Sequence, residues 1–332
     1  MKNKIDGQII LVTGADGFIG SHLVEVLVKN NAKVRALVYY NSWNSIGWLS
    51  DLPQVFRDEI EFITGDIRDA EMIYKSVKGC DIVMHLSSLV AIPYSYEATR
   101  SFVDTNIHGA LNVLNACKGS NISRLVHLST SEVYGSAQQV PISETHLLVA
   151  QPPYSATKIA ADKLAESYYR SFGLPVIIAR PFNTYGPRQT ARAVIPSIIS
   201  QLLSGSEVLE LGSLHPRRDL NYVADVADAL VGLAVCEEAV GEVINIGSGK
   251  DWSIEEVVMK LMDITGRKVE IVTATERVRP AGSEVERLLA DNRKIRTLTG
   301  WKEKICLDEG LRLTVEWIRK NLDHFNPDRY VF

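Results

Sequence analysis

The sequence predicts an α/β fold, a doubly wound parallel sheet followed by a smaller mixed C-terminal lobe that binds a substrate. Two observations support this. From residue 8 to about 180, apolar segments of strand length alternate with segments of helical periodicity, which is the pattern of successive βαβ units. A glycine-rich turn at residues 14–20 joins the first strand to the first helix, where doubly wound folds bind dinucleotides. The predicted sheet is therefore of the Rossmann type.

The first strand and helix can be assigned directly from the residue pattern. Residues 9–13 are an unbroken, largely β-branched apolar run, and residues 21–28 carry apolar side chains at helical spacing. Gly14, Gly17 and Gly20 lie at the junction, where a backbone without side chains admits a pyrophosphate and a helix N-terminus favours its charge. The spacing is G-x-x-G-x-x-G rather than the more common G-x-G-x-x-G. We expect this turn to bind a dinucleotide.

The remaining elements follow from the same periodicities. Strands are predicted at 8–13, 33–39, 59–64, 81–86, 123–129 and 174–180, and helices at 17–30, 69–78, 96–118 and 154–172. Beyond residue 181 the pattern loosens, with helices predicted at 192–205, 224–237, 253–265 and 307–321 and strands at 207–211, 243–246 and 268–272. We expect a dinucleotide-binding domain over 1–180, with later strands from 220–250 interleaved into it, and a substrate-binding lobe over 181–332.

Composition excludes several classes of function. The chain has 332 residues, a net charge of −4 and 46% apolar residues, which is ordinary for a globular enzyme and argues against a nucleic-acid-binding surface. No apolar run approaches the length of a membrane span, and the first strand begins too early for a signal peptide. The four cysteines are scattered without a C-x-x-C pair, so we expect reduced thiols, a cytoplasmic protein and no metal site. They are Cys80, Cys117, Cys236 and Cys306.

Tyr154 and Lys158 stand four residues apart at the start of a predicted helix and so share one helix face. A nearby ammonium stabilises phenolate, which lowers a tyrosine pKa from about 10 toward the range of a general base. Such a tyrosine can take the proton of a sugar hydroxyl while hydride leaves the same carbon for a nicotinamide. A single Y-x-x-x-K is common on protein surfaces, but this one follows a dinucleotide-binding turn.

Residues 128–135 read Leu-Ser-Thr-Ser-Glu-Val-Tyr-Gly and follow a predicted strand at its C-terminal end. Together with the glycine turn and Tyr154/Lys158, this segment resembles the extended short-chain dehydrogenase/reductase family of nucleotide-sugar enzymes, over nearly the whole chain. The resemblance extends to 65–67, 85–88, 106–109, 180–187 and 217–226. It implies cofactor contacts from Gly14, Gly17, Phe18, Ile19, Gly20, Asp66, Ile67, Leu86, Ser87, Ser88, Tyr154, Lys158 and Pro181. It implies substrate contacts from Ser131, Asn183, Arg188, Arg218 and Arg279.

Thr130, Ser131 and Glu132 bear on the choice of reaction. Epimerases of this family commonly have no acid at the third position, whereas a carboxylate there can remove the C5 proton that a C4 ketone acidifies. The resemblance thus implies a nucleotide-sugar 4,6-dehydratase with Thr130, Glu132, Tyr154 and Lys158 as its catalytic residues. The triplet is similar to that of GDP-mannose 4,6-dehydratases, although UDP-glucuronate decarboxylases carry it too.

Two further segments, 38–45 and 279–291, resemble the dehydratases of the legionaminic-acid pathway, which act on a nucleotide-linked N-acetylglucosamine. This implies UDP- or GDP-N-acetylglucosamine as the substrate. The residue pattern itself shows neither the base nor the acetamido group, and leaves the C5 stereochemistry, the downstream pathway and the role of residues 322–332 open.

The cofactor is expected to be NAD, with NADP not excluded. An Asp or Glu usually ends the second strand and binds the adenosine ribose, but Val38 and Tyr39 occupy that position here. No arginine pair replaces the acid, and Arg35 is expected to point along the strand. The ribose contact is expected from residues 39–42.

Other functions remain open on sequence alone. A UDP-glucuronate decarboxylase would use Tyr94, Ser95 or Arg188 near the C6 carboxylate, and a 4-epimerase would share the same scaffold. A non-catalytic NAD(P)-sensing protein is the alternative outside enzymes. Family resemblance also implies a homodimer in which the helices at 96–118 and 154–172 form a four-helix bundle with their partner copies.

Overall fold

The computed structural model describes residues 4–325, apart from the side chains of Glu276 and Ala281. Within that range a seven-stranded sheet runs in the order β11-β6-β5-β4-β1-β2-β3, with every pair parallel. Its strands are β1 (Ile9–Thr13), β2 (Lys33–Tyr39), β3 (Ile60–Gly65), β4 (Ile82–His85), β5 (Arg124–Leu128), β6 (Val176–Pro181) and β11 (Val243–Ile246). The order 3-2-1-4-5-6 is that of the Rossmann fold, so the predicted doubly wound sheet is confirmed, with β11 added at one edge.

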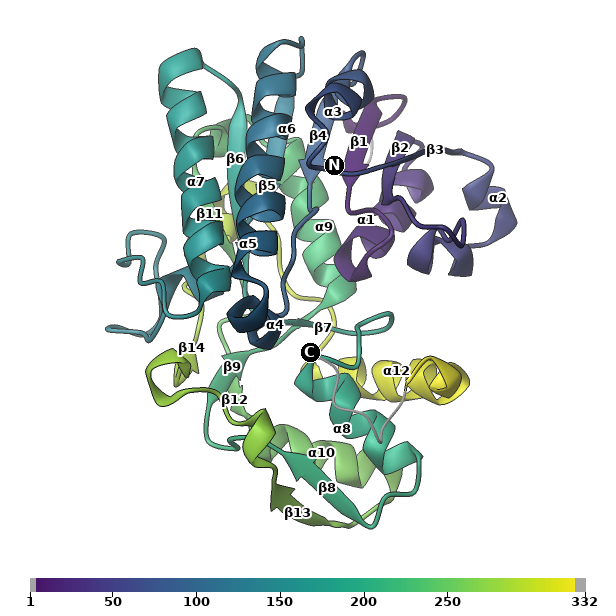
Figure 1. The fold of residues 1–332 in the computed structure, drawn as a ribbon, viewed down its shortest axis with the longest axis vertical. Helices are drawn as coiled ribbons and strands as arrows, with labels where there is room; N and C mark the ends of the chain where they lie inside the picture. Colours follow the sequence, from purple (N-terminus) through teal and green to yellow (C-terminus); the bar gives the residue numbers. More distant parts are fainter. Residues whose placement is uncertain (1–3, 326–332) are drawn as a thin grey trace.

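Helices cover both faces of this sheet (Figure 1). One face packs against α1 (Phe18–Lys29), α9 (Val223–Ala234) and α11 (Arg293–Thr299), and the other against α3 (Ala70–Val77), α6 (Gly109–Lys118) and α7 (Pro153–Phe172). Two short helices, η2 (Gly47–Asp51) and α2 (Gln54–Arg57), follow β2. Because the strands are apolar on both faces, each face contributes to a separate buried core.

The helix predicted at 96–118 is interrupted. It consists of α4 (Ile92–Glu97), α5 (Thr99–Phe102), a π-helical turn η3 (Val103–His108) and α6. Ala98 leaves the helical conformation with φ −118° and ψ 41°. Within η3, Asn106 accepts a hydrogen bond from Leu89 N, donates to Leu89 O and donates to Thr157 Oγ1. The wider π turn therefore positions a buried amide that joins this segment to α7 and to the loop after β4.

The second lobe lies beyond the carboxyl ends of the strands (Figure 1). Its core packs α8 (Val194–Leu203), α10 (Ile254–Thr265) and α12 (Leu307–Lys320) against the strand pair β8 (Val208–Leu211) and β13 (Glu270–Thr273). Between the lobes lie a three-stranded sheet, β12 (Asp251–Ser253), β9 (Arg217–Asp219) and β14 (Arg287–Leu288), and the pair β7 (Thr184–Tyr185) and β10 (Asn221–Tyr222). The remaining short turns are η5 (Glu237–Ala239), whose Ala239 packs in the core of the seven-stranded sheet, and η6 (Thr275–Arg277), η7 (Ala281–Ser283) and η8 (Leu322–His324).

Between residues 4 and 325 no helix combines the length and apolar character that a bilayer span needs. The C-terminal segment that the sequence left without a role begins with η8, and its residues 326–332 lie outside the described range.

The three glycines of the first turn have different steric surroundings. Gly14 has φ +68°, and a Cβ there would lie 2.9 Å from Ser87 N; a Cβ at Gly20 would lie 2.0 Å from Gly14 O. A Cβ at Gly17 would meet nothing closer than Gly14 O, at 3.4 Å. Gly14 and Gly20 are therefore needed for the turn to close, whereas Gly17 leaves space that the protein does not fill.

Gly20→Ala is expected to lower the free energy of unfolding by about 1–3 kcal/mol, because its methyl group overlaps a backbone carbonyl that cannot move freely. Gly17→Ala is the matched control and should change it by less than about 1 kcal/mol. Chemical denaturation of the two variants measures both values. If both variants lowered the free energy of unfolding equally, the close contact between Gly20 and Gly14 would not be what closes the turn.

Candidate active site

The site begins where β1 and β4 end side by side, at the point where the strand order reverses. Thr13 Oγ1 accepts hydrogen bonds from Leu86 N and Ser87 N, both at 3.1 Å, and lies 2.9 Å from His85 Nδ1. These bonds hold the loop after β4 against Gly14, whose Cα faces Ser87. The predicted residues Leu86, Ser87 and Ser88 thus border the glycine turn.

The start of α1 fits a dinucleotide pyrophosphate. The helix begins at Phe18, and Gly17 before it supplies no side-chain cap, so the N–H groups of the first turn have no such partner. Gly17 leaves open space beside them. Uncapped N–H groups, the positive end of a helix and an unfilled approach are the features that hold a phosphate at such a turn.

The other predicted cofactor residues lie at the ends of neighbouring strands. Asp66 follows β3 and pairs with Arg68, with 2.5 Å between Oδ2 and Nη2. Ile67 is buried, and its side chain fills the space at Gly109, where a Cβ would lie 2.9 Å away. Pro181 is the last residue of β6. All three lie on the carboxyl edge of the sheet, although the bulk of Ile67 packs on α6.

Tyr154 and Lys158 lie in the first two turns of α7, and both are buried. The Tyr154 ring packs edge-on against Phe102, with 6.3 Å between centroids. Lys158 Nζ donates to the carbonyl oxygen of Leu128 at 2.7 Å. The helix face that the sequence predicted is therefore directed at the end of β5.

The Tyr154 pKa differs from the sequence expectation. Burial raises it above its ordinary value, the negative charge of Glu132 raises it further, and a hydrogen bond with Thr130 acts in the opposite direction. Burial also lowers the pKa of Lys158 to about 8, while the charge of Asp162 opposes that change. The spacing i, i+4 places the two groups on one face, but desolvation outweighs any effect of the ammonium on the phenol.

Glu132 lies in the turn η4 (Ser131–Tyr134) that follows β5, and Thr130 directly precedes this turn. Thr130 Oγ1 caps this turn by accepting from Glu132 N at 3.2 Å. Glu132 is 7% exposed and Ser131 2%, and Glu132 Oε2 is buried without a hydrogen-bond partner. A buried carboxylate oxygen without a donor is costly, and it lies close enough to Tyr154 to affect the phenol pKa.

A buried ion pair beneath these residues was not predicted from the sequence. Asp162, fully buried on α7, accepts from Arg180 Nη2 at 2.8 Å and from Ser129 Oγ at 2.8 Å. His127 Nε2 lies 3.5 Å from its other oxygen. Arg180 and His127 hold the Asp162 pKa below its ordinary value against the effect of burial. Asp162 is four residues after Lys158, so the tyrosine, the lysine and this carboxylate form one row along α7.

A second group of charges comes from β9 and the segment before β14. Arg218 Nη2 lies 3.2 Å from Glu284 Oε1, and Arg279 Nη1 lies 3.8 Å from the same oxygen. Burial lowers the Arg218 pKa and the charge of Glu132 opposes that change, so the two charges lie within electrostatic range of one another. Asp219 anchors β9 by accepting five hydrogen bonds from neighbouring loops and β10.

Asn183 and Arg188 have different surroundings. Asn183 Oδ1 is buried without a partner, whereas Arg188 Nη2 pairs with Glu25 Oε2 of α1 at 3.0 Å. Arg188 adopts φ +67° and leaves Nε and Nη1 without partners. Ser95, proposed with Arg188 for decarboxylation, is buried and donates to Ile92 O.

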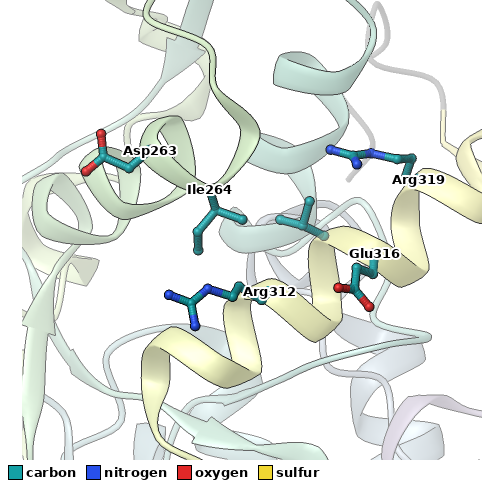
Figure 2. Close-up of a pocket in the computed structure, with 6 residues that line it drawn as sticks. Asp263, Ile264, Arg312, Glu316 and Arg319 are labelled. Carbon is teal, nitrogen blue, oxygen red and sulfur yellow. The ribbon is translucent and has the colours of Figure 1, made fainter.

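The site does not coincide with the hollow between α10 and α12, of about 430 Å³ (Figure 2). The residues that line this hollow are Asp263, Ile264, Arg312, Val315, Glu316 and Arg319. None of them was predicted as a site residue, and the charged ones lie in open solvent rather than around a buried group. Across residues 4–325 no group of three or more His, Cys, Asp or Glu side chains has the arrangement of a metal site.

The matches to known proteins cover the whole of this site. The family model "GDP-mannose 4,6 dehydratase" matches residues 11–314. This chain belongs to that family. The mouse (Mus musculus) dTDP-D-glucose 4,6-dehydratase is 30% identical over 322 residues, which cover 95% of this chain and 90% of that protein.

Solved structures of the family superpose closely on this chain. DesIV, a dTDP-glucose 4,6-dehydratase from Streptomyces venezuelae solved with NAD, has a TM-score of 0.88 at 30% identity and covers 97% of this chain and 100% of that one. The UDP-glucuronic acid 4-epimerase of Bacillus cereus, solved with UDP-glucuronic acid and NAD, has a TM-score of 0.86 at 29% identity and covers 94% and 99%. This family of nucleotide-sugar enzymes thus includes dehydratases and epimerases on one scaffold.

The sequence analysis did not predict the ion pairs made by three residues of the site, Asp162, Arg180 and Glu284. Asp162 could have been found, because it extends the i, i+4 row of Tyr154 and Lys158 by one step. Glu284 could not, because its pairing with Arg218 depends on how two distant segments meet.

Asp162→Asn is expected to lower the free energy of unfolding by about 3–5 kcal/mol, because it leaves Arg180 as an uncompensated buried charge. Asp104→Asn is the control, since its partner Arg100 is 84% exposed and such pairs contribute about 0–1 kcal/mol. Urea denaturation measures both. Equal losses would show that the Asp162–Arg180 pair does not stabilise the sheet edge.

Proposed function

We propose that this protein is a nucleotide-sugar 4,6-dehydratase, a lyase that converts a nucleoside-diphosphate hexose to its 4-keto-6-deoxy derivative. The observation that carries the proposal is Glu132, a buried carboxylate with an unpartnered oxygen beside Tyr154. Oxidation at C4 needs one base, the tyrosine, and a cofactor that accepts the hydride, but removal of the C5 proton needs a second base. Glu132 supplies that base on the same side of the site.

The cofactor in this proposal is NAD, which is bound in the related dehydratase and epimerase structures. It would be held by Gly14, Gly17, Phe18, Ile19 and Gly20 at the pyrophosphate. When bound, it accepts the C4 hydride of the sugar and later returns a hydride to C6. Further contacts are proposed from Asp66, Ile67, Leu86, Ser87, Ser88, Tyr154, Lys158 and Pro181.

Tyr154, Lys158 and Thr130 act at the C4 hydroxyl. Tyr154 removes the hydroxyl proton, and Thr130 donates a hydrogen bond to the same oxygen. Because burial raises the phenol pKa, the tyrosine becomes an effective base only when positive charge is brought close. Lys158 would supply such charge, together with the oxidised nicotinamide when the cofactor is bound.

Glu132 acts once the C4 ketone has formed. It removes the acidified C5 proton and then, now protonated, donates that proton to the departing C6 hydroxyl, which leaves as water. The neighbouring Ser131 carries no acid, so one carboxylate performs both transfers.

The nucleotide diphosphate is proposed to bind between the two lobes. Arg218 and Arg279 offer guanidinium groups suited to phosphate, and each lies within 4 Å of Glu284. The diphosphate would share these cations with Glu284. Ser131, Asn183 and Arg188 are further proposed substrate contacts, and the unpartnered Oδ1 of Asn183 can accept from a sugar hydroxyl.

The proposed substrate is UDP- or GDP-N-acetylglucosamine, on the resemblance of segments 38–45 and 279–291 to legionaminic-acid-pathway dehydratases. The proposal includes the division into a dinucleotide-binding domain over 1–180 and a substrate lobe over 181–332. It also includes a cytoplasmic homodimer paired through the helices at 96–118 and 154–172.

A 4-epimerase is the second candidate, because the family includes proteins such as the Bacillus cereus epimerase. An epimerase has no step for a second base, and Glu132 would then be an unpaired buried carboxylate without a role. Decarboxylation is less well supported, since Arg188 pairs with Glu25 and Ser95 with its own helix. A non-catalytic sensor is disfavoured because one site contains all three of Tyr154, Lys158 and Thr130.

Tyr154→Phe is expected to lower kcat at least about 10²-fold, the usual scale for a lost acid–base group, while the protein still binds cofactor. Tyr168→Phe is the control, since Tyr168 lies on the same helix and donates to Asn115 away from the site. Steady-state turnover measures both. Near-native turnover of the Tyr154 variant would exclude it as the C4 base.

Glu132→Gln is expected to accumulate reduced nicotinamide without dehydrated product, because C4 oxidation proceeds and C5 deprotonation does not. Exchange of solvent deuterium into C5 should fall with it. After a single turnover, absorbance measures the reduced nicotinamide, and mass spectrometry measures the dehydrated product and the deuterium at C5. The control is Glu71→Gln, on the exposed face of α3. A variant that still dehydrates the sugar would overturn the role of Glu132.

Arg218→Ala is expected to raise the substrate KM at least about tenfold, because it removes a charge-assisted phosphate contact. Arg217→Ala is the matched control, since this neighbour pairs with Asp251 and Glu256 on the other side of β9. If KM were unchanged and kcat collapsed, Arg218 would have a structural role instead.

A further inference from the structure

The end of β2 lacks the acid that usually binds the adenosine ribose in this fold. The last residue of the strand is Tyr39, and the side chain of Val38 before it is buried. Yet a carboxylate does lie at this position. Asp16, from the glycine turn, accepts a hydrogen bond from Tyr39 N, with 3.0 Å between the nitrogen and Oδ2.

The position of Asp16 is fixed by the loop that follows β2. Trp48 N donates to Asp16 O at 3.1 Å. Gly47, at φ +56°, passes so close that a Cβ there would lie 2.5 Å from Asp16 O and 2.9 Å from Asp16 Cβ. Asn41 holds the loop in shape by donating to Tyr39 O and Ser45 O. The carboxylate is therefore held by its surroundings and is not a mobile surface group.

Asp16 retains capacity to bind a ligand. A carboxylate has about four acceptor positions, and the bonds from Tyr39 N and from the backbone N–H of Asp16 itself use two of them. Two vicinal ribose hydroxyls are donors of the right number and spacing for the remaining positions. Because Asp16 stands between Gly14 and Gly17, it lies next to the turn proposed to hold the pyrophosphate.

The arginine of β2 and the arginine that follows β3 are both paired. Arg35 binds Glu61 at 2.8 Å and donates to the carbonyl oxygens of Ser76 and Lys78. Arg68 binds both oxygens of Asp66. A 2′-phosphate would therefore meet the Asp16 charge while Arg68, which follows β3, is engaged with Asp66 and Arg35, four residues before the end of β2, is engaged with Glu61.

We propose that Asp16 replaces the missing acid of β2 as the partner of the adenosine ribose hydroxyls, and that it makes the site select NAD over NADP. The inference rests on the proposed use of a nicotinamide dinucleotide. It assigns the ribose contact to the glycine turn and not to residues 39–42.

The test is calorimetric titration of cofactor-free protein with NAD⁺, NADP⁺ and 2′-deoxyadenosine NAD⁺. Wild-type protein should bind NAD⁺ at least about tenfold more tightly than either other ligand, the scale of a lost hydrogen bond to a charged group. Asp16→Ala should bind NAD⁺ about 10–100-fold more weakly than wild-type protein does. The variant should bind the deoxy analogue as tightly as it binds NAD⁺. Asp16→Asn keeps an acceptor for Tyr39 N but removes the negative charge. It should therefore reduce the difference between the affinities for NAD⁺ and NADP⁺.

Asp51→Asn, an exposed acid in η2, is the control and should bind all three ligands like wild type. Thermal unfolding establishes that each variant is folded. If Asp16→Ala lost the same affinity for NAD⁺ and for its deoxy analogue, the inference would be overturned. Asp16 would then only hold the shape of the glycine turn and would not bind the ribose. That result would leave dehydration untouched, whereas wild-type protein that binds no nicotinamide dinucleotide would instead contradict the proposed function.

Discussion

Asp162 lies fully buried at the edge of the sheet, 2.8 Å from Arg180 and one helical turn after Lys158. Without this carboxylate two cations would be buried with no counter-charge, a cost of several kcal/mol for each. The Asp162 carboxylate also opposes the lowering of the Lys158 pKa by burial, and so favours the charged form of the lysine. It also fixes α7 against β6, and that contact positions Tyr154.

The second lobe completes the site from the other side. Arg218 on β9 is within the electrostatic reach of Glu132, and the segment around Glu284 is tied to the first lobe. Tyr96 OH lies 2.5 Å from Ser283 Oγ, and Gln151 Nε2 donates to Gly282 O at 3.1 Å. In the proposed function the nucleotide would contact the second lobe and the cofactor the first, so the two binding sites could vary independently.

The sheet and the positions of most elements could be predicted from the sequence, because their signals are local. Residues 9–13 and 14–20 define a strand and a turn without reference to the rest of the chain. The break at Ala98 could not be predicted, since the π turn depends on the contacts of Asn106 with Leu89 and Thr157. The raised Tyr154 pKa was missed for the same reason, because desolvation depends on distant packing around the helix. Asp16 was overlooked because its significance depends on the end of β2.

The central claim is that the site eliminates water across C5 and C6. The most direct measurement is mass spectrometry of sugar nucleotides after incubation with the pure protein and NAD, using UDP- and GDP-N-acetylglucosamine and UDP-glucuronate in separate reactions. The account predicts that an N-acetylglucosamine nucleotide loses one water, and that in heavy water the product carries deuterium. An unchanged mass with inverted C4, or loss of carbon dioxide from UDP-glucuronate alone, would contradict it.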